Sequence, residues 1–124
     1  METAGFTRGQ LERTLSQRIQ ALYRNQLGHQ PSKVTCQIFE EKIAIILEDS
    51  LTKPEQLLAQ SGREDLAERV RSDLDEVIQP QLKALIEEVV GVSVVDLLSD
   101  AKIDTGRTGT IAVLSEVPKL RNPS

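Results

Sequence analysis

The stretch 42–58, KIAIILEDSLTKPEQLL, constrains the fold most, because an apolar segment runs directly into the start of a capped helix. Its IAIIL core is apolar at every position, which is typical of a strand covered on both faces. Thr52 and Glu55 have the spacing of a capping box, and Pro54 falls in the first helical turn, where its missing N–H costs little. The sequence therefore predicts a central strand followed by a short helix, 54–59.

Two longer amphipathic helices are predicted on either side of this stretch. The first covers 7–27, where aliphatic residues recur at intervals of three and four. The second covers 61–90 and opens with the capping-box spacing of Ser61 and Glu64. Because its apolar stripe keeps its phase through Pro80, we expect one helix that bends at this proline and not two separate helices.

Four strands are predicted, at 33–39, 42–49, 92–103 and 110–116. The order is helix, strand, strand, twice over, with the small helix between the halves. That order results from moving the first strand of a ferredoxin-like unit to its end, with the second and fourth strands central in an antiparallel sheet. Since each long helix has one apolar stripe, both should cover one sheet face in an α+β two-layer sandwich.

The length of 124 residues suits one hydrophobic core. We expect a flexible arm over 1–6, a single domain over 7–117 and a flexible tail over 118–124. No stretch has the apolar core of a signal peptide or the length of a membrane span, so a cytoplasmic protein without membrane insertion is predicted.

Composition argues against several classes of function. A net charge of -4 and an aromatic fraction of 2% disfavour nucleic acid, which needs clustered cations and stacking platforms. One cysteine and one histidine supply neither a disulfide nor a four-ligand zinc site. His29 and Cys36 are interpreted as a loop residue and a core residue and not as a catalytic pair, so no catalytic residue, metal or cofactor is assigned.

The acidic residues of the second long helix have the spacing of a solvated helix face, although a metal or acid–base pair is the alternative. They are Asp73, Asp75, Glu76, Glu87 and Glu88.

The turn Gly106–Arg107–Thr108–Gly109 is a candidate anion site, because glycines let backbone N–H groups converge and arginine adds a paired donor. An ordinary hairpin loop is the alternative interpretation.

The sheet face away from the helices is a candidate dimer interface. Strand alternation predicts that Ile43, Ile45, Leu47, Ile111 and Val113 meet the helices. A large apolar patch is unusual on a monomer, so the opposite set should meet a second copy of the chain. That set is Phe39, Ala44, Ile46, Ala112 and Leu114.

Several motifs carry a family resemblance: DSLTKPEQLLAQSG after the apolar strand, VVGVSVVDLLSD at the end of the long helix, and the last strand TIAVL. Together they resemble the MpsC-like family, and its cyanobacterial-type members in particular, over about residues 10–116. The resemblance implies an accessory role beside membrane sodium or inorganic-carbon transport, with no established catalytic residues to transfer.

We therefore expect a non-enzymatic accessory or regulatory interaction protein that forms a homodimer and contacts a membrane transport complex. A small anion or nucleotide sensor is the alternative, by analogy with other ferredoxin-like dimers.

Overall fold

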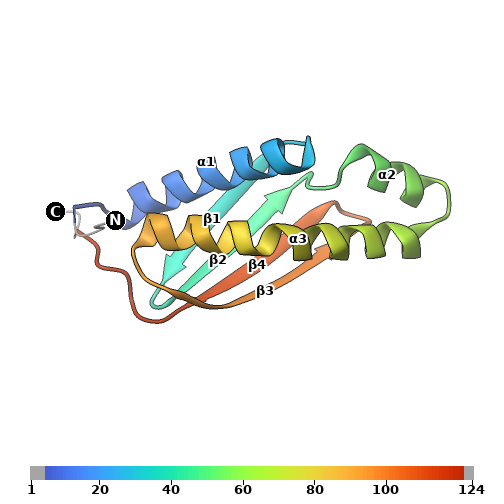
Figure 1. Cartoon of the computed structure of the whole chain (residues 1–124). Helices are drawn as coiled ribbons and strands as arrows, with labels where there is room; N and C mark the ends of the chain where they lie inside the picture. Colours follow the sequence, from blue (N-terminus) through green and yellow to red (C-terminus); the bar gives the residue numbers. More distant parts are fainter. Residues whose placement is uncertain (1–4, 122–124) are drawn as a thin grey trace.

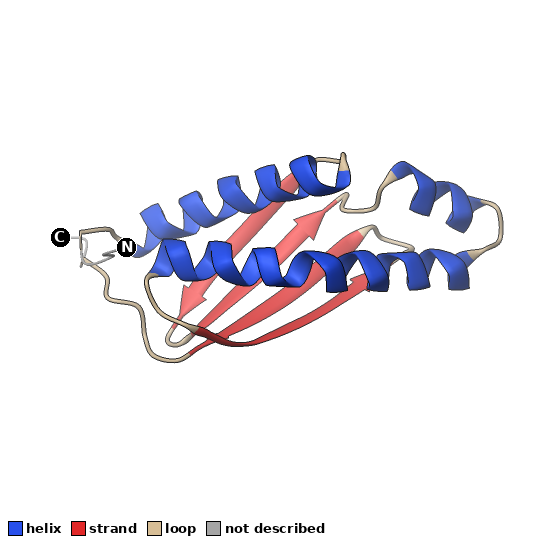
Figure 2. Ribbon diagram, viewed as in Figure 1, coloured by secondary structure: helices blue, strands red, loops and turns tan. Residues whose placement is uncertain are grey.

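The computed structural model describes residues 5–121, and these form two layers, a sheet and the helices that cover it (Figures 1 and 2). The elements in chain order are α1 (Arg8–Leu27), β1 (Lys33–Phe39), β2 (Lys42–Glu48), α2 (Lys53–Gln60), α3 (Glu64–Val90), β3 (Val94–Lys102) and β4 (Arg107–Leu114). The predicted α+β architecture is confirmed. Within residues 5–121, no helix combines the length and the apolar character needed to cross a membrane.

The sheet is antiparallel throughout, with the strand order β1-β2-β4-β3. The second and fourth strands are therefore central, as predicted for the permuted ferredoxin-like arrangement. Helices α1 and α3 lie side by side on one face of this sheet, and α2 lies beyond the ends of the strands, next to the start of α3 (Figure 1).

Helix termini follow the expected capping chemistry at most positions. Thr7 and Gln10 form a reciprocal capping box at the start of α1, and Gly28 ends this helix with a φ of 68°. The predicted cap at Ser61 is wrong, because α2 continues to Gln60 and Ser61 ends it. Arg63 precedes α3 instead, without a side-chain cap.

The core lies between the helices and one sheet face. Ile43, Ile45 and Leu47 of β2 point into it, as predicted. Helices α1 and α3 contribute the other half of the core, through Leu11, Leu15, Ile19, Tyr23, Ile78, Leu82, Leu85, Ile86, Val89 and Val90. Arg18 of α1 and Glu88 of α3 form an exposed ion pair at 3.0 Å between the two helices.

The predicted orientation of β4 is wrong by one residue. Ile43 pairs with Ala112, and Ala44 pairs with Ile111. Directly opposed residues of an antiparallel pair point to the same face, so Ala112 belongs to the core with Ile43. Leu114 is buried there too, while Ile111 is only partly buried on the other face.

The described ends of the chain lie together. Pro118 is buried, and the N–H of Arg121 donates to the carbonyl oxygen of Phe6 at 2.7 Å. Of the predicted arm and tail, positions 1–4 and 122–124 lie outside the described residues.

Pro80 lies in the interior of α3, and the helix continues through it, as predicted. Its side chain is exposed, so replacing it removes no core contact. Pro80→Ala restores a backbone N–H and should raise the free energy of unfolding by about 1–3 kcal/mol. Urea unfolding followed by circular dichroism measures this change.

Pro54→Ala is the matched control, because Pro54 lies in the first turn of α2, where no intrahelical bond is missing. An equal gain at both positions would contradict the account of Pro80.

Candidate functional site

A buried ion pair joins α2 to α3. The side chain of Arg71 is 2% exposed and that of Glu55 is 0% exposed. Arg71 Nε donates to Glu55 Oε2 at 2.7 Å, and Arg71 Nη2 donates to Glu55 Oε1, so the contact is bidentate. Bidentate arginine–carboxylate pairs fix geometry as well as energy. This pair therefore sets where α2 lies against α3.

The same guanidinium also holds the connection between β2 and α2. Arg71 Nη2 donates to the carbonyl oxygen of Ser50 at 2.9 Å, and Arg71 Nη1 donates to Asp75 Oδ1 at 3.1 Å. The Ser50 hydroxyl donates to the carbonyl oxygen of Gly106 at 2.9 Å and lies 2.7 Å from the Thr108 hydroxyl. One network therefore ties α2, α3, the end of β2 and the start of β4 together.

The charges of this network depend on each other. Burial works to raise the pKa of Glu55, but hydrogen bonds from Arg71 and Thr52 outweigh it and hold the pKa below the ordinary value. Burial raises the pKa of Asp75, against the attraction of Arg71. A lowered pKa in the folded state means that Glu55 contributes stability above its ordinary pKa and loses it as the pH falls.

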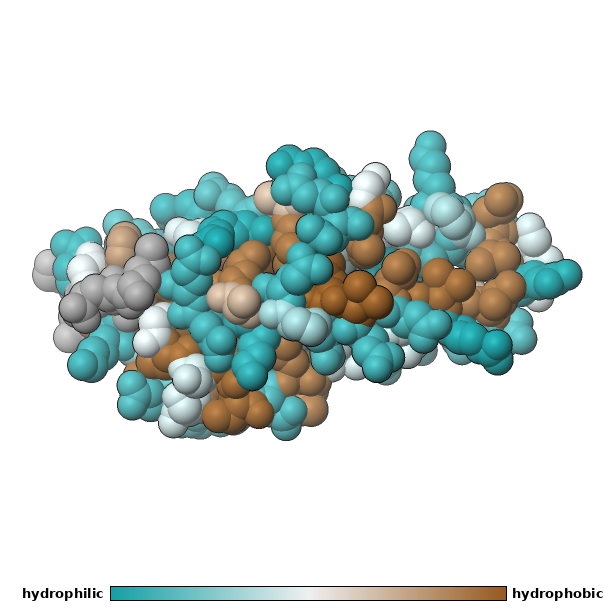
Figure 3. Space-filling model, in the orientation of Figure 1, coloured by the Kyte–Doolittle hydropathy of each residue, from teal (hydrophilic) through white to brown (hydrophobic). Residues whose placement is uncertain are grey.

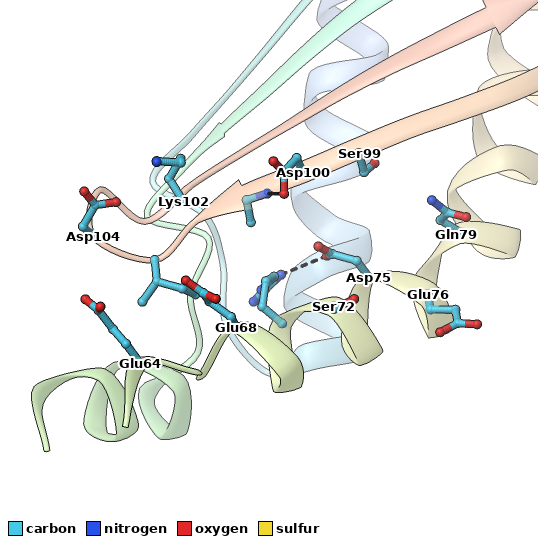
Figure 4. Close-up of a pocket in the computed structure, with 13 residues that line it drawn as sticks. Glu64, Glu68, Ser72, Asp75, Glu76, Gln79, Ser99, Asp100, Lys102 and Asp104 are labelled. Carbon is cyan, nitrogen blue, oxygen red and sulfur yellow. Dashed lines mark hydrogen bonds and ion pairs between the residues drawn. The ribbon is translucent and has the colours of Figure 1, made fainter. Parts of the chain in front are cut away.

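A hollow of about 720 Å³ lies beside this network, between the first half of α3 and the edge strand β3 (Figure 4). Asp75 lines the hollow and points toward Arg71, and Asp104 lines it from the turn after β3. Its carboxylates outnumber its cations, since Arg71 and Lys102 face Glu64, Glu68, Asp75, Glu76, Asp100 and Asp104.

The hollow is thus unsuited to anions, because the net field of its walls is negative. Among residues 5–121, no group of three or more histidine, cysteine or acidic side chains is placed to hold a metal ion. Asp73, Glu87 and Glu88 of the predicted acidic set do not line the hollow, and Glu87 instead accepts the N–H of Val94 at 2.8 Å.

Residues 106–109, the candidate anion-binding turn, do not form the single turn that was predicted. Only Gly106 lies in the turn, with a φ of 74°, because β4 begins at Arg107 and not at residue 110. Arg107 Nε donates to Glu48 Oε1 at 2.7 Å, and Thr108 is fully buried against Ser50. Gly109 lies within the strand. These four residues therefore do not converge as a loop of free donors.

The predicted dimer face is partly rearranged. Phe39 and Ile46 are 44% and 40% exposed on the sheet face away from the helices, and Ala44 is partly exposed there. Ala112 and Leu114 are buried in the core, so this part of the prediction is wrong. Both alternate sets of β4 are apolar, which is why alternation alone did not distinguish them.

His29 and Cys36 occupy separate structural roles. The Nε2 atom of His29 lies 2.7 Å from the carbonyl oxygen of Asp49. Cys36 is part of the aliphatic core, and burial raises the pKa of its thiol to about 11. The thiol is therefore protonated at neutral pH, and the thiolate is the nucleophilic form.

A second apolar area lies on the helix side of the molecule. Figure 3 shows hydrophobic groups over α2 and the first half of α3, and further hydrophobic groups in the lower part of the view, among hydrophilic ones. Leu57 of α2 is 64% exposed, and Val77 of α3 is 67% exposed.

Sequence reasoning missed the Arg71–Glu55 pair. The available signal was positional, because Arg71 follows Ala67 by four residues and precedes Ile78 by seven, which places a cation on the buried stripe of α3. Glu55 had been assigned only to the capping box, where its Oε1 also accepts the N–H of Thr52 at 3.0 Å.

Comparison with known proteins gives one family. The family model described as Na+-translocating membrane potential-generating system (MpsC) matches residues 7–116. No curated protein and no solved structure matches the chain significantly.

Removing one partner of the buried pair should destabilise the fold strongly. Arg71→Met leaves the Glu55 carboxylate buried without its cation and should cost about 3–5 kcal/mol of unfolding free energy. The double variant Arg71→Met/Glu55→Leu removes both charges and should be more stable than Arg71→Met alone. Urea unfolding at neutral pH measures both values.

Arg18→Met breaks an exposed pair and is the matched control, for which little change is expected. If the double variant were no more stable than Arg71→Met alone, the loss would come from packing and not from an unpaired charge.

Proposed function

Because the chain belongs to the MpsC family, we propose that it is a non-enzymatic accessory protein of a Na+-translocating membrane-potential-generating system. The observation that carries this proposal is the extent of the family match, which covers nearly all of the described domain. The proposed location is the cytoplasm, where the unpaired thiol of Cys36 stays reduced.

The surface of the molecule supports action through protein contacts. Exposed aliphatic side chains include Leu57 and Val77 on the helix side, over α2 and α3, and Ile46 and Leu98 on the open side of the sheet. Large exposed apolar patches are typical of protein interaction sites. We assign the α2–α3 area, with Leu57 and Val77, to a component of the transport system and the sheet face to self-association in a homodimer.

The side chains with catalytic potential support a non-enzymatic role. Cys36 is buried with a raised pKa, and the ring of His29 is already in contact with the backbone of Asp49. The alternative role as an anion or nucleotide sensor has less support, because Arg107 is paired with Glu48 and the hollow beside Arg71 has acidic walls.

Deletion of the protein in its native cell should lower the Na+-dependent part of the membrane potential. A potential-sensitive dye measures this part as the difference between media containing Na+ and media in which K+ replaces it. The wild-type chain should restore the difference, and Leu57→Asp should restore less of it because the charge disrupts the proposed contact surface.

Gln60→Asp carries the same charge at an exposed position of α2 and serves as the control. Cys36→Ala and His29→Gln should restore the potential as well as the wild type does. An unchanged potential in the deletion strain would contradict the association, and failure of folded Cys36→Ala or His29→Gln would contradict a non-enzymatic role.

A further inference from the structure

The open face of the sheet is the face that α1 and α3 leave uncovered. Its apolar residues come from all four strands: Phe39, Ala44, Ile46, Leu98, Ile111 and Val113. Cross-strand register places Ala44, Ile111 and Leu98 in one row across the sheet. The apolar band is therefore continuous from β2 to the edge strand β3.

Strand β2 presents an ordered series of side chains to this face. Lys42, Ala44, Ile46 and Glu48 follow each other along it, because alternate residues of a strand share a face. The series reads as positive, small, large and negative. When β2 of a second copy lies over this strand and runs in the opposite direction, each charged side chain faces one of opposite charge. The small side chain then faces the large one.

Strand β4 shows the same kind of self-complementarity. Gly109 lies next to Ile46, and Ile111 lies next to Ala44. When the two copies face each other with their strands running in opposite directions, Ile111 of one copy therefore lies opposite Gly109 of the other. A Cβ atom at Gly109 would lie 3.5 Å from Ile46 Cδ1, so the Ile46 side chain leans toward this glycine and fills part of the space above it.

We propose that a second copy of this chain packs face to face on the open face, with the two-fold axis running across the strands at the level of Ile45. This arrangement, which specifies the homodimer of the proposed function, puts Lys42 opposite Glu48 of the partner subunit. It puts Ala44 opposite Ile46 of the partner subunit. Each contact occurs twice, because a two-fold interface is isologous.

The hydrogen bonds of the single chain are compatible with this pairing. Lys42 Nζ donates to Glu41 Oε1, and an ammonium group has further N–H donors for Glu48 of the partner subunit. Glu48 Oε1 accepts from Arg107 Nε at 2.7 Å. A carboxylate has a second oxygen, so Glu48 can keep Arg107 and also accept from Lys42 of the partner subunit.

A two-fold axis along the strands fits the charges less well. That axis would exchange the two edges of the sheet while keeping the same end of each strand together. Lys33 of β1 and Lys102 of β3 lie at the same end of the sheet, since their neighbours Glu48 and Arg107 form an ion pair. The axis along the strands would place these two lysines opposite each other, and their repulsion offsets the attraction between Glu48 and Arg107 in the same row. The axis across the strands instead places Lys102 opposite Asp96 of the partner subunit, which is attractive.

The size of the face indicates a weak dimer. Four strands about 4.8 Å apart and seven residues long at about 3.3 Å per residue cover on the order of 450 Å². Stable interfaces bury about 800 Å² on each partner, so this one is smaller than a standard interface and belongs with the weak, transient ones. We expect a concentration-dependent dimer with a micromolar dissociation constant.

Charge reversal followed by mixing tests the axis directly. Lys42→Glu alone and Glu48→Lys alone should each weaken the dimer about tenfold, because each places like charges opposite one another twice. An equimolar mixture of the two variants should recover dimers, since every facing pair is then opposite in charge. Sedimentation equilibrium from about 1 to 200 μM, a range that brackets the expected constant, measures all of these populations.

Lys83→Glu on α3 reverses a charge away from this face and should leave the wild-type dissociation constant unchanged. Circular dichroism confirms that each variant is folded. The proposed pairing would be overturned if Lys42→Glu left the dissociation constant of the dimer unchanged, or if the mixture stayed monomeric. The homodimer itself would still stand in either case. A wild-type chain that is monomeric at all concentrations would overturn both, and the membrane-potential measurement would still test the accessory role separately.

Discussion

Two long helices can cover only one face of a four-stranded sheet, and this constraint governs the rest of the molecule. On the covered face, β2 and β4 supply Ile43, Ile45, Leu47, Ala112 and Leu114 to a closed aliphatic core. On the other face the same two strands present Ala44, Ile46 and Ile111 without a helix above them. The central strands are therefore apolar on both sides, although helices cover only one of them.

The Glu55–Arg71 pair solves a second problem, which is the placement of α2. This helix of eight residues is too short to be stable by itself and contacts the rest of the chain mainly through α3. Only a small cluster of Leu51, Ala67 and Ile103 lies beneath it. A bidentate, fully enclosed ion pair gives this small contact a defined geometry, and Ser50 and Thr108 extend it to the sheet. The exposed Leu57 is held in place as a result.

Much of the fold could be predicted from the sequence, since the capping box of Thr7 and Gln10 and the apolar run of β2 are local signals. The helix through Pro80 followed from the phase of its stripe. The orientation of β4 could not be predicted in the same way, because it depends on its register with β2, and both of its alternate sets are apolar. The prediction of an anion-binding turn at 106–109 failed for a related reason. Arg107 and Thr108 pair with residues distant in the sequence, so β4 begins earlier and takes in most of the predicted turn.

The central claim is that the open face of the sheet is an interface between two copies of the chain. Backbone amide NMR spectra recorded over a range of dilution from high to low micromolar concentration test it most directly. The account predicts concentration-dependent shifts at Ala44, Ile46, Gly109 and Ile111, with little change along the outer surfaces of α1 and α3. Shifts confined to α2 and α3, or none at any residue, would contradict it.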